Sequence, residues 1–222
     1  MSEMELTLAT VNYNADDFLG LLLRDVKSPV VVVDTTPNKI PKFIVKDNVK
    51  TYVFGDNIGH GAGINYALSK IKTEYTLVVD VDCHFVNTNW QESFLKYKSF
   101  DIITVNGPPV KPLRPACLFG KTELLKKYDF QPTPGYKGLP EQGFDVGIKA
   151  YYEMIEDGLK FKWMKVTKGR YGPARSEEYG FEEPLVYHYW HGSHLHEPDR
   201  QKEFPEIDLI REKELFLSSF IV

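Results

Sequence analysis

Two aspartates stand two residues apart in LVVDVDCHF (77–85), directly after a run of apolar residues. In a regular strand, side chains at positions i and i+2 point to the same face of the sheet. Hard divalent cations prefer oxygen ligands, and Mg²⁺ commonly bridges one or two carboxylates to substrate phosphates. Asp80 and Asp82 are therefore candidates for a site that holds a metal ion and a diphosphate. The simpler alternative is a pair of solvated aspartates that close a strand.

Histidines gather in the segment VYHYWHGSHLHEPDR (186–200), which holds four of the six in the chain. Neutral imidazole is a common ligand for Mn²⁺ or Zn²⁺. His188 and His191 are the favoured ligand candidates, because a short strand over 185–190 would deliver them to the edge of a sheet. The alternative is an exposed polar loop with one packed histidine. A structural zinc site is less favoured, because no cysteine lies nearby.

Glycines mark a third segment, DNIGHGAGINYAL (56–68). Glycine lets the backbone approach a ligand closely, and a helix N-terminus favours anionic groups. The spacing is not a dinucleotide-binding fingerprint, and the chain has no phosphate-binding loop of the GxxxxGK[ST] type. A tight turn into a helix, with no ligand, is the alternative interpretation.

Strands and helices alternate in the first 85 residues, a pattern that predicts an α/β fold with a mostly parallel central sheet flanked by helices. Asn14 is the expected N-cap of the first helix. Ligands bind such sheets beyond the carboxyl ends of the strands. Asp34, Asn57, Asp80 and Asp82 all fall at or just after those ends. The expected strands span 5–13, 29–34, 51–54 and 75–81, and the expected helices 15–26 and 59–72.

The second half of the chain is less regular, and no domain boundary is visible. We expect one domain over 1–222, with a nucleotide-sugar-binding half (1–105) and a half that carries the acceptor site and a metal-binding C-terminal segment (106–222). The Pro- and Gly-rich segment 131–143 predicts a loop, and 168–180 predicts a mobile loop. Further expected strands span 101–106, 115–119 and 185–190, and further expected helices span 144–155 and 206–217.

Bulk composition excludes several classes of protein. The formal net charge of −4 argues against broad attraction to nucleic acid or anionic membrane. The chain has two cysteines, Cys83 and Cys117, which predict reduced thiols. The N-terminus lacks the features of a signal peptide, and no apolar run reaches the length of a membrane span. These features predict a soluble, cytoplasmic protein.

Four motifs in order carry a resemblance to a known family: TVNYN (10–14), VVVVD (30–34), DNIGHGAGIN (56–65) and LVVDVD (77–82). The series resembles the nucleotide-binding half of family 2 glycosyltransferases, which have the GT-A fold. The HYWHGS run also resembles a segment of some viral and bacterial transferases, and a viral origin would imply the host cytoplasm. One departure is that many relatives carry an arginine near the start of the helix, where this chain has HGAG (60–63). Neutralisation of phosphate would then depend more on the metal.

The resemblance implies roles for individual residues at the donor site. Tyr13 would contact the nucleobase, and Asp34 would accept a hydrogen bond from a base N–H. Asp80 would face the ribose or the metal, and Asp82 would bind the metal, Mn²⁺ or Mg²⁺, opposite a histidine from late in the chain. The same comparison places Thr10, Asn57, Gly59 and Val81 at the donor.

The segment LPEQGFDVGIKAYY (139–152) is the candidate source of the catalytic base. In the family, an acidic residue at a helix N-terminus takes this role. Glu141 lies in the expected loop and Asp145 in the first helical turn, so both remain candidates. A helix dipole stabilises the ionised form of Asp145 and lowers its pKa, so a base role would need burial to offset that effect. Helix capping for Asp145 and an exposed loop position for Glu141 are the alternatives.

Together these features predict a metal-dependent inverting glycosyltransferase. It would move a sugar from a nucleotide-sugar, with UDP-sugars favoured, to a hydroxyl of a glycan or another acceptor. One alternative is a nucleotidyltransferase that forms sugar nucleotides, but such enzymes usually have a Gly-rich loop after the first strand, where this chain has TVNYNADD. A second alternative is a carbohydrate-binding module without activity, which would not explain the ordered donor motifs.

Overall fold

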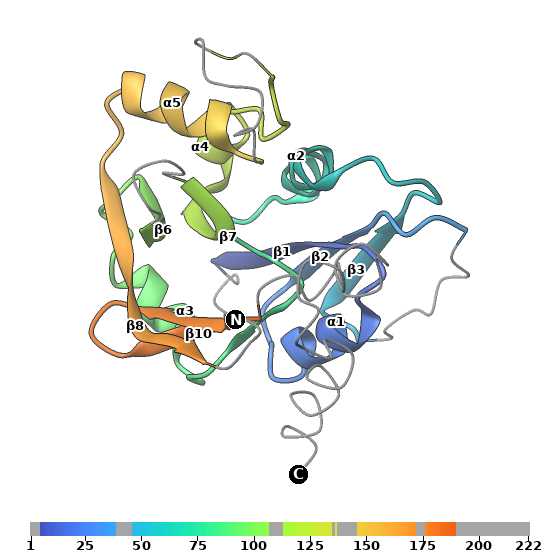
Figure 1. The fold of residues 1–222 in the computed structure, drawn as a ribbon, viewed down its shortest axis with the longest axis horizontal. Coiled ribbons are helices and arrows are strands. Elements are labelled where there is room, and N and C mark those ends of the chain that lie inside the picture. The colour runs from blue at the N-terminus through green and yellow to red at the C-terminus, as the bar shows by residue number, and fades with distance from the viewer. Residues whose placement is uncertain are drawn as a thin grey trace.

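The computed structural model describes residues 5–38, 46–106, 113–134, 136, 146–171 and 176–189. Within these residues, ten strands form a single sheet in the order β3-β2-β1-β4-β7-β6-β8-β9-β10-β5. The sheet curls, so that β8 and β10 lie away from the plane of β1–β3 (Figure 1). The strands are β1 (Leu6–Asn12), β2 (Val30–Asp34), β3 (Val49–Val53), β4 (Tyr75–Val79), β5 (Cys83–Phe85), β6 (Ile102–Asn106), β7 (Leu113–Lys121), β8 (Phe161–Tyr171), β9 (Ser176–Gly180) and β10 (Pro184–His188).

The first four strands confirm the alternating pattern of the sequence, because β3, β2, β1 and β4 pair in parallel. Helices flank them on both sides: α2 lies on one side of β1–β3 and α1 on the other (Figure 1). The described helices are α1 (Asp16–Leu23), α2 (His60–Lys70), α3 (Trp90–Leu95), α4 (Thr122–Leu125) and α5 (Ile148–Glu156).

The apolar core has two layers because the central strands are buried on both faces. In β1, Leu6 and Leu8 belong to the core layer that includes α1, while Ala9 and Val11 belong to the layer that includes α2. Val30 to Val33 in β2 alternate in the same way. This alternation explains why PVVVVD reads as a continuous apolar run, as expected for a strand covered by helices on both sides.

The second half corrects two expectations. The sheet as a whole is not mostly parallel, because β7 pairs antiparallel with β4 and β6, and β9 pairs antiparallel with β8 and β10. The predicted loop at 168–180 is largely strand, formed by the end of β8 and by β9. The segment is rich in charged residues and glycine, which obscures the strand signal, and its backbone is satisfied by the pairing of β8 with β9 and of β9 with β10.

Several predicted features lie outside the described residues: the end of the loop at 131–143, the first two residues of the helix at 144–155, and the helix at 206–217. Glu141 and Asp145 fall in these segments and His191 also lies outside the described residues, so the roles of all three stay predictions. Among the described residues, none of the helices is both long and apolar enough to cross a membrane.

Candidate functional site: a carboxylate and imidazole cluster at the strand ends

Three parallel strands end next to one another, and each end carries a polar residue of the site. Asn12 and Asp34 are register partners at the ends of β1 and β2, and Asp80 follows β4 directly. This placement agrees with the rule that open α/β sheets bind ligands beyond the carboxyl ends of their strands. The order of the parallel strands therefore creates one polar edge.

Asp80 and Asp82 lie in a tight turn rather than in a regular strand, since β4 ends at Val79. The N–H of Cys83 donates to the carbonyl of Asp80 (3.0 Å) and closes the turn. Two further hydrogen bonds hold the turn. The N–H of Asp80 donates to the carbonyl of Ala116 on β7, and the N–H of Tyr189 donates to the carbonyl of Asp82 (2.9 Å). The backbone of β7 and of the residue after β10 thus holds the turn that carries both carboxylates.

His188 meets the two aspartates because β10 pairs antiparallel with β5, in the register His188 to Cys83. Its Nε2 lies 3.3 Å from Asp82 Oδ1 and 3.7 Å from Asp80 Oδ2. The side chains of His188 and Asp82 are each 6% exposed, whereas that of Asp80 is 23% exposed. The cluster is therefore closed around Asp82 and His188 and open to solvent on the side of Asp80.

The surroundings of His188 favour positive charge at its ring. Burial lowers its pKa, but the charges of Asp82, Asp80 and Glu177 and the hydrogen bond to Asp82 outweigh burial, so the net pKa is raised. The other ring nitrogen, Nδ1, lies 3.5 Å from the hydroxyl of Tyr179, which donates to Glu177 (2.8 Å). Tyr179 is fully buried, so it can hold the ring with Nε2 toward the carboxylates.

These residues fit a divalent cation. Buried carboxylate oxygens and an imidazole nitrogen form a donor set that suits Mn²⁺, and carboxylates alone suit Mg²⁺. Asp82, Cys83 and His188 also bring three ligand atoms within 4.8 Å of one another. However, the Cys83 thiol donates to the carbonyl of Ala116, and burial together with Asp80 and Asp82 raises its pKa well above the usual value. We therefore assign the candidate cation site to Asp80, Asp82 and His188.

The glycine-rich segment before and within α2 has structural reasons for its glycines. Gly59 adopts φ +83°, a backbone conformation that residues with a side chain rarely adopt. Its N–H donates to Asn57 Oδ1 (2.9 Å). A Cβ on Gly61 would meet the backbone of Phe130 and Gln131, and one on Gly63 would lie 2.8 Å from the methyl groups of Val11. Two of the glycines that the sequence suggested for ligand approach thus serve packing.

Asp34 and Asn12 hold the loop that follows β1. Asn12 Nδ2 donates to Asp34 Oδ2 (3.0 Å) and to Asp16 Oδ1 (2.9 Å), and Asn12 Oδ1 accepts from the N–H of Ala15. Asp34 Oδ1 accepts from the N–H of Thr36 (3.0 Å). Sequence reasoning did not single out Asn12, although it lies within TVNYN. Contact of Asp34 with a nucleobase stays a prediction beside this internal role.

Other predicted donor-site residues lie near this edge with different exposure. Tyr13 follows β1 and is half-buried, whereas Thr10 is fully buried inside that strand and Val81 is buried in the apolar core. Asn14 is not the N-cap of α1, a place that Ala15 takes. Asn14 instead has φ +52° and donates its N–H to Thr36 Oγ1, which joins the loops after β1 and β2.

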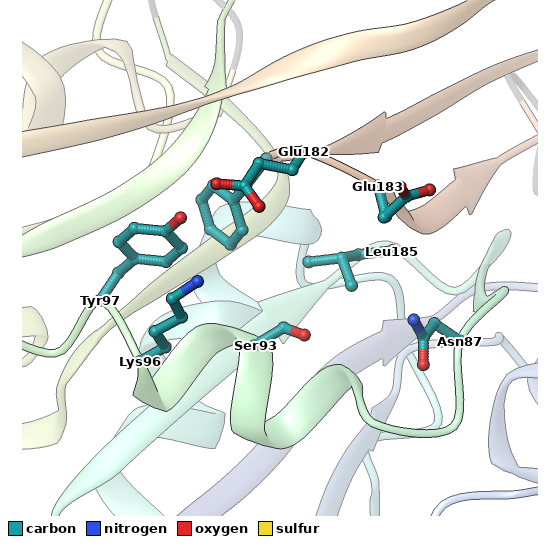
Figure 2. Close-up of a pocket in the computed structure, with 8 residues that line it drawn as sticks. Asn87, Ser93, Lys96, Tyr97, Glu182, Glu183 and Leu185 are labelled. Atoms are coloured by element: carbon teal, nitrogen blue, oxygen red, sulfur yellow. The ribbon is translucent and has the colours of Figure 1, made fainter.

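A separate hollow of about 140 Å³ lies between α3 and the turn that joins β9 to β10 (Figure 2). Lys96, Tyr97, Glu182 and Glu183 are among the residues that line it. It adjoins the start of β10, whereas His188 is the last residue of that strand. The hollow therefore shares no residue with the carboxylate and imidazole cluster.

No protein-family model matches this sequence, and no curated protein matches it either. Among solved structures, it is similar to the mannosyltransferase PcManGT from Pyrobaculum calidifontis in complex with GDP-Man and Mn²⁺ (14% identity, 72% of this chain, 54% of that chain, TM-score 0.50). Another match is S. aureus TarS 1–349 in complex with UDP-GlcNAc (22% identity, 59% of this chain, 49% of that chain, TM-score 0.47). A third is the bifunctional IspDF from Campylobacter jejuni (16% identity, 72% of this chain, 49% of that chain, TM-score 0.48).

This chain spans about half the length of these solved structures. At such identities, the similarity to the mannosyltransferase establishes a shared α/β fold and nothing about activity. The chain thus has a fold that is also found in a protein with a nucleotide-sugar and a metal ion bound.

Proposed function

We propose that this chain is a metal-dependent glycosyltransferase that transfers a sugar from a nucleotide-sugar donor, a UDP-sugar by preference, to a hydroxyl of a glycan or another acceptor. The observation that carries the proposal is the meeting of Asp80, Asp82 and His188 at the carboxyl edge of the parallel strands. The fold shared with a mannosyltransferase that binds GDP-Man and Mn²⁺ supports it.

In the proposed site, Asp82 and His188, which are buried, and Asp80, which is more exposed, would hold the cation. When bound, Mn²⁺ or Mg²⁺ would neutralise charge that develops on the departing diphosphate. The pKa of His188 is raised by the neighbouring carboxylates, so the cluster already favours positive charge between them. The chain would thereby supply a positively polarised environment for an anionic leaving group.

The remaining roles rest on the sequence. Tyr13, Asp34, Asn57 and Gly59 would surround the nucleoside at the ends of β1–β3. Glu141 or Asp145 would take a proton from the acceptor hydroxyl, which attacks the anomeric carbon from the face opposite the diphosphate and inverts its configuration. The bond to the acceptor oxygen forms as the bond to the diphosphate breaks, and the nucleoside diphosphate leaves.

A panel of nucleotide-sugars tests the proposal, with the unfolding temperature measured with and without Mn²⁺. A matching donor at saturating concentration should raise the midpoint by about 5 °C or more, because ligand binding stabilises the folded state. The stabilisation should require Mn²⁺ and should be lost in Asp82→Asn.

Product analysis with the matching donor then separates the reaction types. Release of the nucleoside diphosphate and an acceptor product with inverted configuration supports the proposal, whereas release of pyrophosphate from a nucleotide and a sugar phosphate would indicate a nucleotidyltransferase. Binding of sugars without any binding of nucleotides would instead favour a carbohydrate-binding module.

A further inference from the structure

A second imidazole reaches the cluster from the opposite side. His60 is the first residue of α2, and its Nε2 lies 3.3 Å from Asp80 Oδ1. The other oxygen of the same carboxylate, Oδ2, lies 3.7 Å from His188 Nε2. The two oxygens of Asp80 therefore face two imidazoles that come from different elements.

The packing of α2 explains why His60 lies there. Gly63 packs directly against the side chain of Val11 on β1, and Gly61 packs against the backbone of Phe130 and Gln131, where in both cases a Cβ would clash. Gly59 turns the chain with φ +83° immediately before the helix. These contacts bring the first turn of α2 close to the strand ends. The His60 side chain, 33% exposed, is thus set beside Asp80 at the open side of the cluster.

We propose that His60 is a positioning residue for Asp80, an inference that rests on the proposed function. His60 Nε2, 3.3 Å from Asp80 Oδ1, would hold the carboxylate so that Oδ2 faces Asp82 and His188 when a cation binds. A carboxylate with free rotation would have to be ordered each time a cation binds. Groups that orient metal ligands in this way are typically worth about 10- to 100-fold in metal affinity.

Two substitutions at one position test the proposal on the full chain: His60→Gln, whose amide can still donate an N–H, and His60→Phe, a ring of similar shape without a donor. Mn²⁺ affinity is measured without nucleotide by electron paramagnetic resonance of the free ion. We expect His60→Phe to weaken Mn²⁺ binding by about 10-fold or more and His60→Gln to restore most of the loss. Because His60 is partly exposed, the unfolding temperature without metal should change by about 2 °C or less in both.

Three results would overturn the inference in distinguishable ways. Equal Mn²⁺ affinity in His60→Phe and the unmodified chain would remove the positioning role and leave the cation site intact. Loss of a nitrogen coupling from the bound Mn²⁺ signal in both variants, with no rescue by Gln, would make His60 a direct ligand instead. Absence of Mn²⁺ binding in the unmodified chain, with and without a nucleotide-sugar, would refute the metal-dependent function itself.

Discussion

The candidate site joins two regions of the sheet that are built in different ways. The carboxylates of Asp80 and Asp82 follow β4, which pairs in parallel with β1 and antiparallel with β7 and lies between the two layers of the core. The imidazole of His188 ends β10, which lies among antiparallel strands and pairs with β5. The comparison shows that one region supplies the negative charge and the other supplies the group that faces it, so neither forms the site alone.

The largest effect is expected from removing the charge in the parallel region. Asp82→Asn keeps the shape of the side chain but removes the negative charge beside His188. We expect the Mn²⁺-dependent release of nucleoside diphosphate to fall by about 100-fold or more, a loss typical of a group that stabilises developing charge. Asp25→Asn, at an exposed aspartate paired with Arg24, is the control and should keep full activity. Unchanged turnover and metal dependence in Asp82→Asn would refute the role of this carboxylate.

The antiparallel region is tested by His188→Ala against His84→Ala. As whole residues, both histidines are 5% exposed, and they lie on the paired strands β10 and β5. Burial, with a contribution from Arg24, lowers the pKa of His84 to about 4, so this ring is neutral at pH 7. We expect His188→Ala to weaken Mn²⁺ binding by about 100-fold, measured by calorimetric titration. His84→Ala should reduce stability without a comparable loss of metal affinity, and equal losses would mean that burial rather than ligation explains the result.

The contact between α2 and the parallel strands is tested by Gly63→Ala against Gly20→Ala. A Cβ on Gly63 would lie 2.8 Å from two methyl carbons of Val11, whereas one on Gly20 in α1 would meet no atom within 4 Å. We expect Gly63→Ala to lower the free energy of unfolding by about 1–3 kcal/mol because of overpacking, measured by urea denaturation. Gly20→Ala should raise it by up to about 1 kcal/mol through helix propensity. If both substitutions stabilise, α2 does not need this close approach.

The smallest effect is expected at Cys83, which lies between the two regions. Cys83→Ser keeps a donor for the carbonyl of Ala116, which accepts the hydrogen bond of the thiol. Because the buried thiol stays protonated, the substitution should leave Mn²⁺ affinity unchanged in a calorimetric titration. A large loss of Mn²⁺ affinity in Cys83→Ser would place Cys83 among the ligands. So would a preference of the unmodified chain for Zn²⁺ over Mn²⁺ that Cys83→Ser lacks.

The parallel region could be predicted in detail because its signals are local. Apolar runs such as VVVVD and LVVDVD indicate strands buried on both faces, as the structure shows. The glycines from 59 to 63 predicted a turn into a helix, but the sequence did not show that Gly61 and Gly63 serve the packing of α2. The strands in residues 168–180 were missed because charged residues and glycines there leave no regular alternation of apolar and polar side chains. Their strand character depends on pairing with other strands rather than on the local residue pattern.

By itself, the sequence determined the order of the first strands and helices, the position of Asp80 and Asp82 after a buried strand, and the presence of candidate histidines late in the chain. Only the tertiary structure decided that the sheet curls so that β10 pairs with β5, that His188 faces Asp82, and that His60 faces Asp80. The physical reason is that apolar periodicity is set by near neighbours in the chain. The meeting of His188 with two carboxylates depends on hydrogen bonds between segments far apart, and these leave no local pattern.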